Sequence, residues 1–582
     1  MTHTLSMEQA AVLERTGRFV LRACPGSGKT FLVGRRVAYR IAEWSERHAG
    51  LAVLSFTNVA CDEIRNTVHA AACSQAFVYP HFIGTLDSFI NQFIFLPFGC
   101  SVMGCKGRPR VVGAGGSPLP TTGIWGWGKG NSDCQKNRCT LAHFSWDPSD
   151  AFVDIRPNKI KCTRNYEVCK RLKDRFRHSG YATQTDAAYW AVRALRLAPA
   201  IARALVQRFP EIIVDEAQDT SELQMAILDL LVDAGLKHLL LVGDPDQAIY
   251  EWREARPELL ERKTIAAGWE HPSLLTESHR NPQLLCNAVA QFSTLASPVR
   301  GRDTADQPEL WFYKKAEMSE LPARFERSCD EQRIAATSDT CSVLARGRVG
   351  IRRLAGFPDE VDPWKDGDPI TRALAEVAIE RDRGDRKTAR RHLESLLVRA
   401  FCSHDHDHGL ARVLQISHPD VGVLLFSVLS VLPSSTEAVA SWVQEANATV
   451  EGILKEIAPN RVSEWPGLSV KAFTMVGRAR SIEFRNRPLV SFFTGTHVVG
   501  RVRVETIHAA KGKTYEAVLL VLDNHSKECT PKRLLEQHPP DRRTAYVAMT
   551  RARRYLAVAV PDDTKAERLA PFDQFKRVIE TS

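Results

Sequence analysis

Short apolar runs alternate with longer segments of helical periodicity in the first half of the chain and again near its end. The runs cover residues 19–23, 52–56, 211–214, 238–242, 517–522 and 555–560. Continuous apolar strands followed by turn residues and helices are typical of parallel sheets with helices on both faces. The pattern predicts an α/β fold built on two parallel sheets.

Two segments of different character interrupt this alternation. Residues 97–165 are rich in Gly, Pro, Trp and Cys, whereas residues 366–402 are charged and follow a helical pattern. Such changes of composition indicate insertions into the two α/β units. We expect the inserted parts to be mainly helical. No repeat of fixed period and no low-complexity tract is visible.

The charge balance favours an anionic partner. The 582 residues have a formal net charge of +10, and residues 100–180 contain 15 Lys and Arg against 6 Asp and Glu. Basic clusters gain affinity for nucleic acids by releasing counterions from the phosphates. The first insertion therefore holds most of the excess positive charge.

We expect a cytoplasmic protein with no membrane contact. The first 19 residues lack an apolar run of signal-peptide length, and the apolar stretch 421–432 is shorter than the about 20 residues that cross a bilayer. The 14 cysteines are accordingly interpreted as thiols or metal ligands rather than a disulfide framework.

A phosphate-binding loop follows the first apolar run. It comprises Ala23, Cys24, Pro25, Gly26, Ser27, Gly28, Lys29 and Thr30. In such loops the glycines let backbone N–H groups surround phosphate oxygens, the lysine reaches the β and γ phosphates, and the Thr hydroxyl is a ligand of Mg²⁺. Ala23 stands where the general pattern has its first Gly. The alternative is a glycine-rich turn between a strand and a helix.

Two adjacent acids end a later apolar run, I-I-V-D-E-A-Q-D at residues 212–219. Asp215 is expected to hold Mg²⁺, and Glu216 to orient and deprotonate the attacking water. Adjacent carboxylates at the end of a buried strand are costly without a cation. The alternative, that both acids cap the next helix, does not account for Lys29 and Thr30.

These motifs, in this order, resemble the UvrD/Rep-like superfamily 1 DNA helicases, and the resemblance continues through both α/β units. L-S-M-E-Q at 5–9 resembles the Q motif, in which Gln9 reads adenine. S-F-T-N at 55–58 and G-T-L-D-S-F at 84–89 resemble motifs Ia and Ib. The DNA contacts implied by these two motifs are Phe56, Thr57, Asn58 and Thr85.

V-G-D-P-D-Q-A-I-Y-E-W-R at 242–253 resembles motif III. The resemblance implies that Gln247 couples the γ-phosphate to the DNA-binding face. Tyr250 and Trp252 offer flat rings on which bases stack, at about 1–3 kcal/mol each. The alternative role of both rings is packing between domains.

Three motifs of the second α/β unit complete the resemblance. T-E-S-H-R-N-P at 276–282 resembles motif IV, with Arg280 reaching the γ-phosphate and His279 in place of the family's usual Tyr. V-E-T-I-H-A-A-K-G-K-T-Y-E at 504–516 resembles motif V, in which Thr506 and His508 touch DNA and Gly512 lies at the nucleotide. R-R-T-A-Y-V-A-M-T-R-A at 542–552 resembles motif VI, with Arg551 as the arginine finger.

One position departs from the family pattern. Thr514 stands where motif V commonly has a Glu that contacts the ATP ribose, so either nucleotide discrimination is looser or Glu516 substitutes. This variant, with G-T-L-D-S-F-I-N-Q-F-I at 84–94, is more similar to the UvrD-like subunits of phage-defence systems of the Gabija type. That similarity implies a partner nuclease of the OLD family.

The resemblance also implies a domain plan. RecA-like domain 1A would comprise 1–96 and 185–271, interrupted by insertion 1B at 97–184. RecA-like domain 2A would comprise 272–355 and 496–582, interrupted by insertion 2B at 356–495. ATP and Mg²⁺ would bind between 1A and 2A, and the family moves 3′ to 5′ on single-stranded DNA or from a single-stranded tail.

Two other functions fit parts of the sequence. The same motifs serve an ATPase subunit that senses DNA ends and activates a partner nuclease without processive unwinding. A small-molecule P-loop kinase would use the phosphate loop, but it needs neither a second α/β unit nor Arg551.

Cysteine and histidine clusters raise the question of a metal. Insertion 1B contains Cys100, Cys105, Cys134, Cys139, Cys162 and Cys169, and C-S-H-D-H-D-H occupies 402–408. Zinc and iron–sulfur clusters take thiolates, but these spacings are not C-x2-C. Small buried thiols in 1B and a solvated loop at 402–408 are the alternatives.

Overall fold

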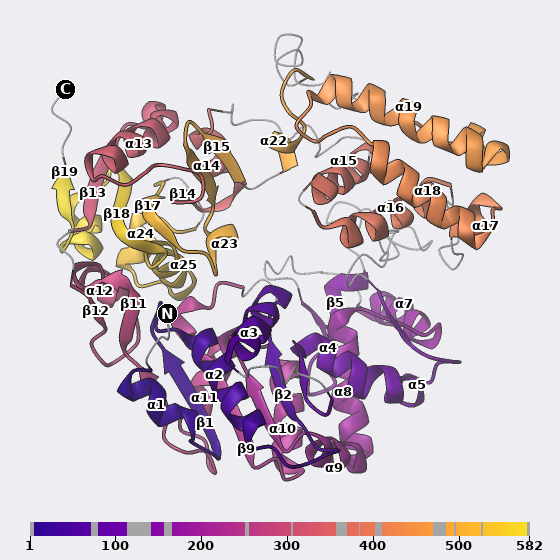
Figure 1. Ribbon diagram of the computed structural model, residues 1–582, viewed down its shortest axis with the longest axis horizontal. Coiled ribbons are helices and arrows are strands. Elements are labelled where there is room, and N and C mark those ends of the chain that lie inside the picture. Colours follow the sequence, from indigo (N-terminus) through magenta and orange to yellow (C-terminus); the bar gives the residue numbers. More distant parts are fainter. Residues whose placement is uncertain are drawn as a thin grey trace. The chain divides into compact units, whose positions relative to one another are not determined.

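A computed structural model gives the fold of the chain (Figure 1). It describes residues 5–71, 79–112, 141–155, 166–250, 255–303, 307–356, 369–382, 384–401, 410–469, 485–493, 496–524 and 528–578. The chain divides into two compact units. The first comprises 1–110, 136–356 and 498–582, and the second comprises 111–135 and 357–497.

The first unit contains a six-stranded sheet in the order β10-β1-β9-β8-β2-β3, and all of its pairs are parallel. Its strands are β1 (Arg18–Ala23), β2 (Leu51–Ser55), β3 (Phe82–Thr85), β8 (Glu211–Val214), β9 (His238–Gly243) and β10 (Ser273–Leu275). Phe19 and Leu21 of β1 pack with Val33 and Val37 of helix α2 (Lys29–Ala42) in one buried cluster. Helix α3 (Asn58–Ala71) joins this cluster through Ile64.

A second sheet of seven strands lies in the same unit, in the order β15-β16-β14-β17-β18-β13-β19. Its strands are β13 (Glu309–Tyr313), β14 (Cys341–Ala345), β15 (Thr496–Val499), β16 (Val502–Thr506), β17 (Tyr515–Val521), β18 (Ala552–Pro561) and β19 (Lys576–Val578). Neighbours from β16 to β19 pair in parallel. The two α/β sheets that the apolar pattern predicts are therefore present.

Both faces of the second sheet are covered, which explains the unbroken apolar run of β17. Val518 and Leu520 are buried in a cluster with helix α25 (Pro539–Met549), whereas Ala517 and Leu519 are buried in a cluster with α13 (Leu321–Glu331) and α14 (Gly347–Leu354). Successive side chains of a strand point to opposite faces, so a strand covered on both faces has no polar alternation.

The connection from β3 to β8 contains the first insertion. It includes helices α4 (Leu86–Ile90), α5 (Leu96–Met103), α7 (Tyr166–His178), α8 (Gln184–Leu197) and α9 (Pro199–Arg208), together with the antiparallel strands β5 (Phe144–Trp146) and β6 (Phe152–Asp154). The insertion thus combines helices with a short hairpin. Lys173 and Asp186 form a buried ion pair of 2.8 Å within it.

The helical run Leu86–Met103 is long and apolar enough, by length and composition alone, to cross a membrane. In this structure its side chains Phe89, Ile94 and Phe95 are fully buried. The run also contacts α8 through its middle turn, a π-helix at Asn91–Phe95, and through α5. These contacts pack the run against helix α8.

The second unit is helical in the part that the structure describes. Its main helices are α15 (Pro369–Asp382), α16 (Arg386–Phe401), α17 (Leu410–Leu414), α18 (His418–Val431) and α19 (Val439–Ile457). Leu393, Leu424, Trp442 and Leu454 are among the side chains of its separate apolar core. Helices α15 and α16 confirm the helical pattern predicted for residues 366–402. The boundaries expected for the four domains stay predictions.

Candidate active site

The phosphate loop has the strand, turn and helix that its residue pattern predicts. Strand β1 ends at Ala23, and α2 begins at Lys29 with Gly28 as its N-cap. Gly26 and Gly28 have φ angles of +77° and +75°, a left-handed backbone conformation that residues with a Cβ rarely adopt. The Cys24 N–H donates to the Leu275 carbonyl at 2.9 Å, so the loop is also attached to strand β10.

The loop has the properties of a phosphate site. The Ser27 hydroxyl oxygen is buried and has no hydrogen-bond partner among the described residues. It lies beside the N-terminus of α2, a helix of 14 residues whose first N–H groups favour an anion. A buried hydroxyl without a partner is unfavourable unless a ligand supplies one. The residues therefore fit the triphosphate of a nucleotide.

Asp215 and Thr30 meet at the end of strand β8. The Thr30 hydroxyl donates to Asp215 Oδ2 at 3.2 Å, which joins the phosphate loop to the acidic pair. Burial raises the pKa of Asp215, and the neighbouring charge of Glu216 raises it further. Such a carboxylate favours a cation, and a hydroxyl and a carboxylate oxygen are suitable ligands for Mg²⁺.

Glu216 is held in a left-handed backbone conformation with φ of +54°, which is uncommon for a residue with a side chain. Burial acts to raise its pKa, but Lys29, Lys511 and Arg551 lower it well below the ordinary value. The side chain is therefore a carboxylate at neutral pH. That protonation state suits a group that orients water and accepts its proton.

Gln218 is a site residue that the sequence did not single out. Its amide nitrogen donates to Glu216 Oε2, and its amide oxygen accepts from the Asp244 N–H at 3.1 Å. A Cβ on Gly243 would lie 2.4 Å from that oxygen, so the glycine makes room for the amide. Gln218 thus connects Glu216 to the segment after β9.

Gln247 and Arg551 bring the two sheets together. Gln247 follows β9 of the first sheet, and its amide oxygen accepts from Arg551 Nη2 at 3.2 Å. Arg551 precedes β18 of the second sheet and is 2% exposed. Burial lowers the pKa of Arg551 to about 9, and Arg280 lowers it as well. Two buried cations near one another favour an anion between them.

The segment that contains Arg280 packs directly on the phosphate loop. The His279 N–H donates to the Gly26 carbonyl at 3.0 Å, and the Ser278 hydroxyl donates to the Pro25 carbonyl at 2.7 Å. A Cβ on Gly26 would lie only 2.4 Å from the Arg280 Cβ. This close approach requires glycine at 26. The His279 side chain itself is 52% exposed.

Lys511 is the second residue that the sequence did not single out. Its ammonium lies 2.6 Å from Asp219 Oδ2, and the two side chains are 10% and 1% exposed. The same ammonium lies 4.4 Å from the centre of the Tyr250 ring. Lys511 belongs to the motif V segment of the second sheet and Asp219 follows β8 of the first, so this buried ion pair links the two sheets.

Aromatic rings of both sheets line up beside Lys511. Phe56 after β2 stacks on Tyr250 with 5.5 Å between ring centres and an interplanar angle of 22°. Tyr250 lies 6.1 Å from the His508 ring. Burial and Arg346 lower the pKa of His508 to about 4, so its ring is neutral at physiological pH. We call Phe56, Tyr250, His508 and Lys511 the aromatic strip.

The remaining residues predicted to contact the nucleotide or DNA lie at several separate places. Gln9 is buried and donates to the Ser27 carbonyl at 3.0 Å, which places it against the phosphate loop. Thr85 and Thr506 are helix N-caps, of α4 and of α23 (Ile507–Ala510). Thr57 and Asn58 are exposed. Trp252 lies outside the described residues.

Gly512 and Thr514 of the motif V segment lie at the surface. Gly512 has a φ angle of +84°, and no atom lies within 4 Å of the position of an added Cβ. Thr514 is exposed. Glu516 forms an ion pair with Arg553 at 3.2 Å, so its carboxylate is engaged on the second sheet.

Asp246 lies at the centre of a third connection between the sheets. Its carboxylate is 1% exposed and pairs with Arg22 of β1 at 3.0 Å and with Arg542 of α25 at 3.2 Å. Thr294 donates its N–H to the same carboxylate at 2.6 Å. Asp246 directly precedes Gln247, so the connection holds the segment that contacts Arg551.

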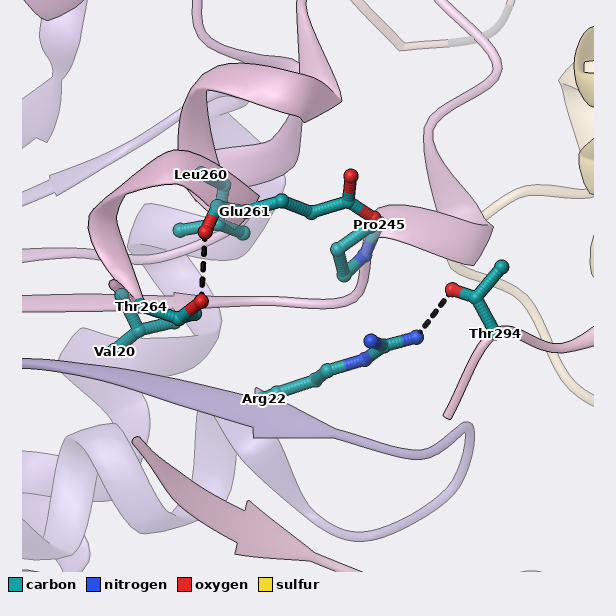
Figure 2. Close-up of a pocket in the computed structure, with 7 residues that line it drawn as sticks. All are labelled: Val20, Arg22, Pro245, Leu260, Glu261, Thr264 and Thr294. Carbon is teal, nitrogen blue, oxygen red and sulfur yellow. Dashed lines mark hydrogen bonds between the residues drawn. The ribbon is translucent and has the colours of Figure 1, made fainter. Parts of the chain in front are cut away.

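A cavity of about 250 Å³ opens beside this connection (Figure 2). In the figure the Arg22 side chain extends along the cavity to Thr294, and Nη2 donates to the Thr294 hydroxyl at 2.6 Å. The lining residues are Val20, Arg22, Pro245, Leu260, Glu261, Thr264 and Thr294.

The cysteines do not form a metal site in the part of the chain that is described. No group of three His, Cys, Asp or Glu side chains there is arranged to hold a metal ion. Cys100 donates to the Cys105 carbonyl at 3.0 Å, and Cys105 and Cys169 are buried. Cys134, Cys139, Cys162 and residues 402–408 lie outside the described residues.

Two family models match the chain. The UvrD/REP helicase N-terminal domain matches residues 5–96 and 135–266. The UvrD-like helicase C-terminal domain matches residues 494–562. Together they cover about half of the chain, and the matched segments include the phosphate loop, the acidic pair, the aromatic strip and Arg551.

Curated relatives match over shorter stretches. DNA helicase II of Haemophilus influenzae is 25% identical over 42% of this chain and 34% of its own length. ATP-dependent DNA helicase PcrA of Leuconostoc citreum is 23% identical over 50% of this chain and 39% of its own. An ATP-dependent helicase/nuclease subunit of Carboxydothermus hydrogenoformans is 31% identical over 24% of this chain and 13% of its own.

The matched region thus spans well under two thirds of each of these relatives. On these matches, the chain belongs to the UvrD-like helicase family.

Proposed function

We propose that the protein hydrolyses ATP in response to DNA and uses the reaction to move 3′ to 5′ on single-stranded DNA. The observation that carries this proposal is the contact of Gln247 with Arg551 at 3.2 Å. It brings a residue of the first sheet to the arginine finger of the second. A site assembled from two α/β sheets can open and close with the nucleotide, which a site on one sheet cannot do.

The residues at this site divide the chemistry between them. Lys29 and the N-terminus of α2 bind the phosphates, and Mg²⁺ held by Thr30 and Asp215 would supply positive charge beside them. Glu216 orients the water and accepts its proton. Arg280 and Arg551 stabilise the negative charge that develops on the γ-phosphoryl group.

Two connections can transmit the state of this site to DNA. Tyr250 follows Gln247 by three residues, so one short segment joins the γ-phosphate site to the aromatic strip. Lys511 contacts both Asp219 and the Tyr250 ring. A base stacked on Phe56 or Tyr250 would gain about 1–3 kcal/mol. Opening of the site would then change the grip on the strand.

The biological setting is also a proposal. The motif V variant supports a role in phage defence with a partner nuclease of the OLD family. One relative is named as a helicase/nuclease subunit, which supports a nuclease partner in general terms. In that setting the ATPase could serve as a sensor of DNA ends rather than as a processive motor.

A strand-displacement assay beside an ATPase assay tests the proposal. The substrates are duplexes with a 3′ tail, a 5′ tail or blunt ends, and Lys29→Ala is the inactive control. Displacement of the 3′-tailed duplex alone, with ATP turnover stimulated by the single strand, is expected. Stimulated turnover without displacement would replace the motor with the DNA-end sensor.

A further inference from the structure

A second cavity, of about 440 Å³, lies on the second sheet away from the residues described so far. Its walls are the first residues of β13, the whole of β19, Tyr555 of β18 and one face of helix α13. Four cations and two carboxylates line it, namely Arg324, Arg327, Lys576, Arg577, Glu309 and Glu331. We call it the basic pocket.

Part of the basic pocket is rigid. The Arg324 guanidinium lies 4.4 Å from the centre of the Trp311 ring and donates to the Phe312 carbonyl at 3.1 Å. Glu309 Oε2 accepts from Trp311 Nε1 at 2.8 Å and from the Tyr555 hydroxyl at 2.7 Å. These contacts fix one cation and one carboxylate in the wall before any ligand arrives.

The remaining cations are available. Arg327, Lys576 and Arg577 are exposed, and no carboxylate of the described residues pairs with them. Arg324 and Arg327 are three residues apart on α13 and so lie on the same face of the helix. The four cations outnumber the two carboxylates of the lining, so the pocket has a net positive charge.

The pocket borders an open sheet edge. Strand β19 is the last strand of the second sheet and pairs with β13 (Figure 1, yellow beside β13). Lys576 donates its N–H inward to the Pro308 carbonyl at 2.8 Å. Because successive residues of a strand direct their N–H and C=O groups to opposite sides, those of Arg577 point away from β13. Such an edge can pair with another strand.

We propose that the basic pocket and the outer edge of β19 bind an acidic peptide segment of a partner protein. The segment would add as a strand to β19, pairing with the backbone of Arg577 and placing its carboxylates on Arg327 and Lys576, which lie on the face of the sheet that α13 covers. Backbone pairing would supply affinity, and the pocket would select acidic side chains. This inference goes beyond the proposed helicase activity and does not depend on it.

Nucleic acid fits this pocket less well. A DNA backbone has one negative charge per about 1.7 Å of duplex, so it favours a surface of uniform positive charge. Glu309 and Glu331 interrupt the positive charge of the pocket. A volume of about 440 Å³ accommodates one or two side chains and is too small for a nucleic-acid duplex.

The pocket is also separate from the aromatic strip. In a parallel sheet all strands begin at one end of the sheet and finish at the other. His508 lies in α23, directly after the end of β16, whereas Glu309 and Lys576 begin β13 and β19. The pocket therefore lies at the end of the sheet where the strands begin, opposite to His508.

A binding assay on the full chain tests the proposal. The probe is a fluorescein-labelled ten-residue peptide of alternating Glu and Val, and its partner control alternates Lys and Val. The test variant combines Arg327→Ala, Lys576→Ala and Arg577→Ala. A matched variant, Arg35→Ala with Arg203→Ala and Lys237→Ala, removes three exposed cations from the helices and a loop of the first sheet.

The acidic peptide should bind the parent and the matched variant equally and should lose at least about tenfold in affinity for the test variant. Hydrogen exchange should show new protection of the Arg577 amide when the peptide is bound. Both variants should keep the circular dichroism spectrum and melting temperature of the parent.

Three outcomes would overturn the inference. They are equal peptide affinity of the parent and the test variant, equal affinity of the acidic and the basic peptide for the parent, and loss of affinity for a labelled 20-nucleotide single strand in the test variant only. The last would assign the pocket to nucleic acid. None of these results bears on ATP turnover, so they leave the proposed function to its own test.

Discussion

Replacing Lys511 should remove an ion pair that links the two sheets. In the parent its ammonium pairs with Asp219 at 2.6 Å, and both side chains are largely buried. Burial raises the pKa of Asp219 to about 6, while Lys511 acts to lower it. Lys511→Met removes the ammonium that lies over the Tyr250 ring and leaves the Asp219 carboxylate buried without its cation.

The magnitude follows from the burial of the pair. Removing one partner of a buried ion pair costs about 3–5 kcal/mol, because the remaining charge is uncompensated. Asp219→Asn together with Lys511→Met removes both charges, so the double variant should recover part of the loss. The coupling free energy between the two substitutions should reach about 2 kcal/mol. Lys532→Met, which breaks an exposed pair with Glu536, should change stability by about 0.5 kcal/mol or less.

The assay is urea unfolding of the parent, the two single variants, the double variant and the Lys532→Met control, followed by circular dichroism. ATP turnover with and without single-stranded DNA is measured on the same preparations. Lys511→Met should lose most of the stimulation by DNA. Additive effects of the two substitutions on stability, with full stimulation retained, would refute the role given to this pair.

Three further variants test other parts of the account. Glu216→Gln should bind ATP with near-parental affinity and hydrolyse it about 10²–10⁴-fold more slowly, as single-turnover kinetics would show, because the amide cannot accept the proton. Asp246→Asn should lower the melting temperature, at a cost of about 1–3 kcal/mol, since Arg22 and Arg542 lose their shared carboxylate; an unchanged melting temperature would remove Asp246 from the connection between the sheets. For His508 the folded pKa lies below the unfolded value, so the folded state loses stability as pH falls from about 6.5 to about 4, by up to about 3 kcal/mol. His508→Gln should flatten the pH dependence of urea unfolding in that window, and an identical profile for parent and variant would contradict the assignment.

The strands were predictable because burial on both faces leaves a continuous apolar run. The apolar runs that predicted β17 and β18 begin too late in the sequence. Strand β17 begins at Tyr515 and not at 517, and β18 begins at Ala552 and not at 555. Arg553 and Arg554, which lie in the first residues of β18 and are not fully buried, break the apolar pattern there. Polar residues at a strand end give no periodic signal, although the backbone continues to pair.

The phosphate loop and the acidic pair were predictable because their chemistry requires neighbouring residues. Lys511 and Gln218 were not predicted for two different reasons. A lysine in a polar segment looks like a surface residue, and its partner Asp219 is 292 residues away in the sequence. Gln218 stands inside D-E-A-Q-D, where only the fold shows that its amide bridges Glu216 and Asp244. A buried acid next to the catalytic pair was the one available signal that a distant cation must exist.

The most direct test of the account is steady-state ATP turnover by the parent and by a folded Arg551→Ala variant, each with and without single-stranded DNA. We predict that DNA accelerates turnover by the parent and that the variant loses about 10³-fold or more of the stimulated rate while it binds the strand with near-parental affinity. Turnover that ignores DNA and is unchanged in the Arg551→Ala variant would show that the first sheet acts alone, as in a small-molecule P-loop kinase, and would contradict a site assembled from both sheets.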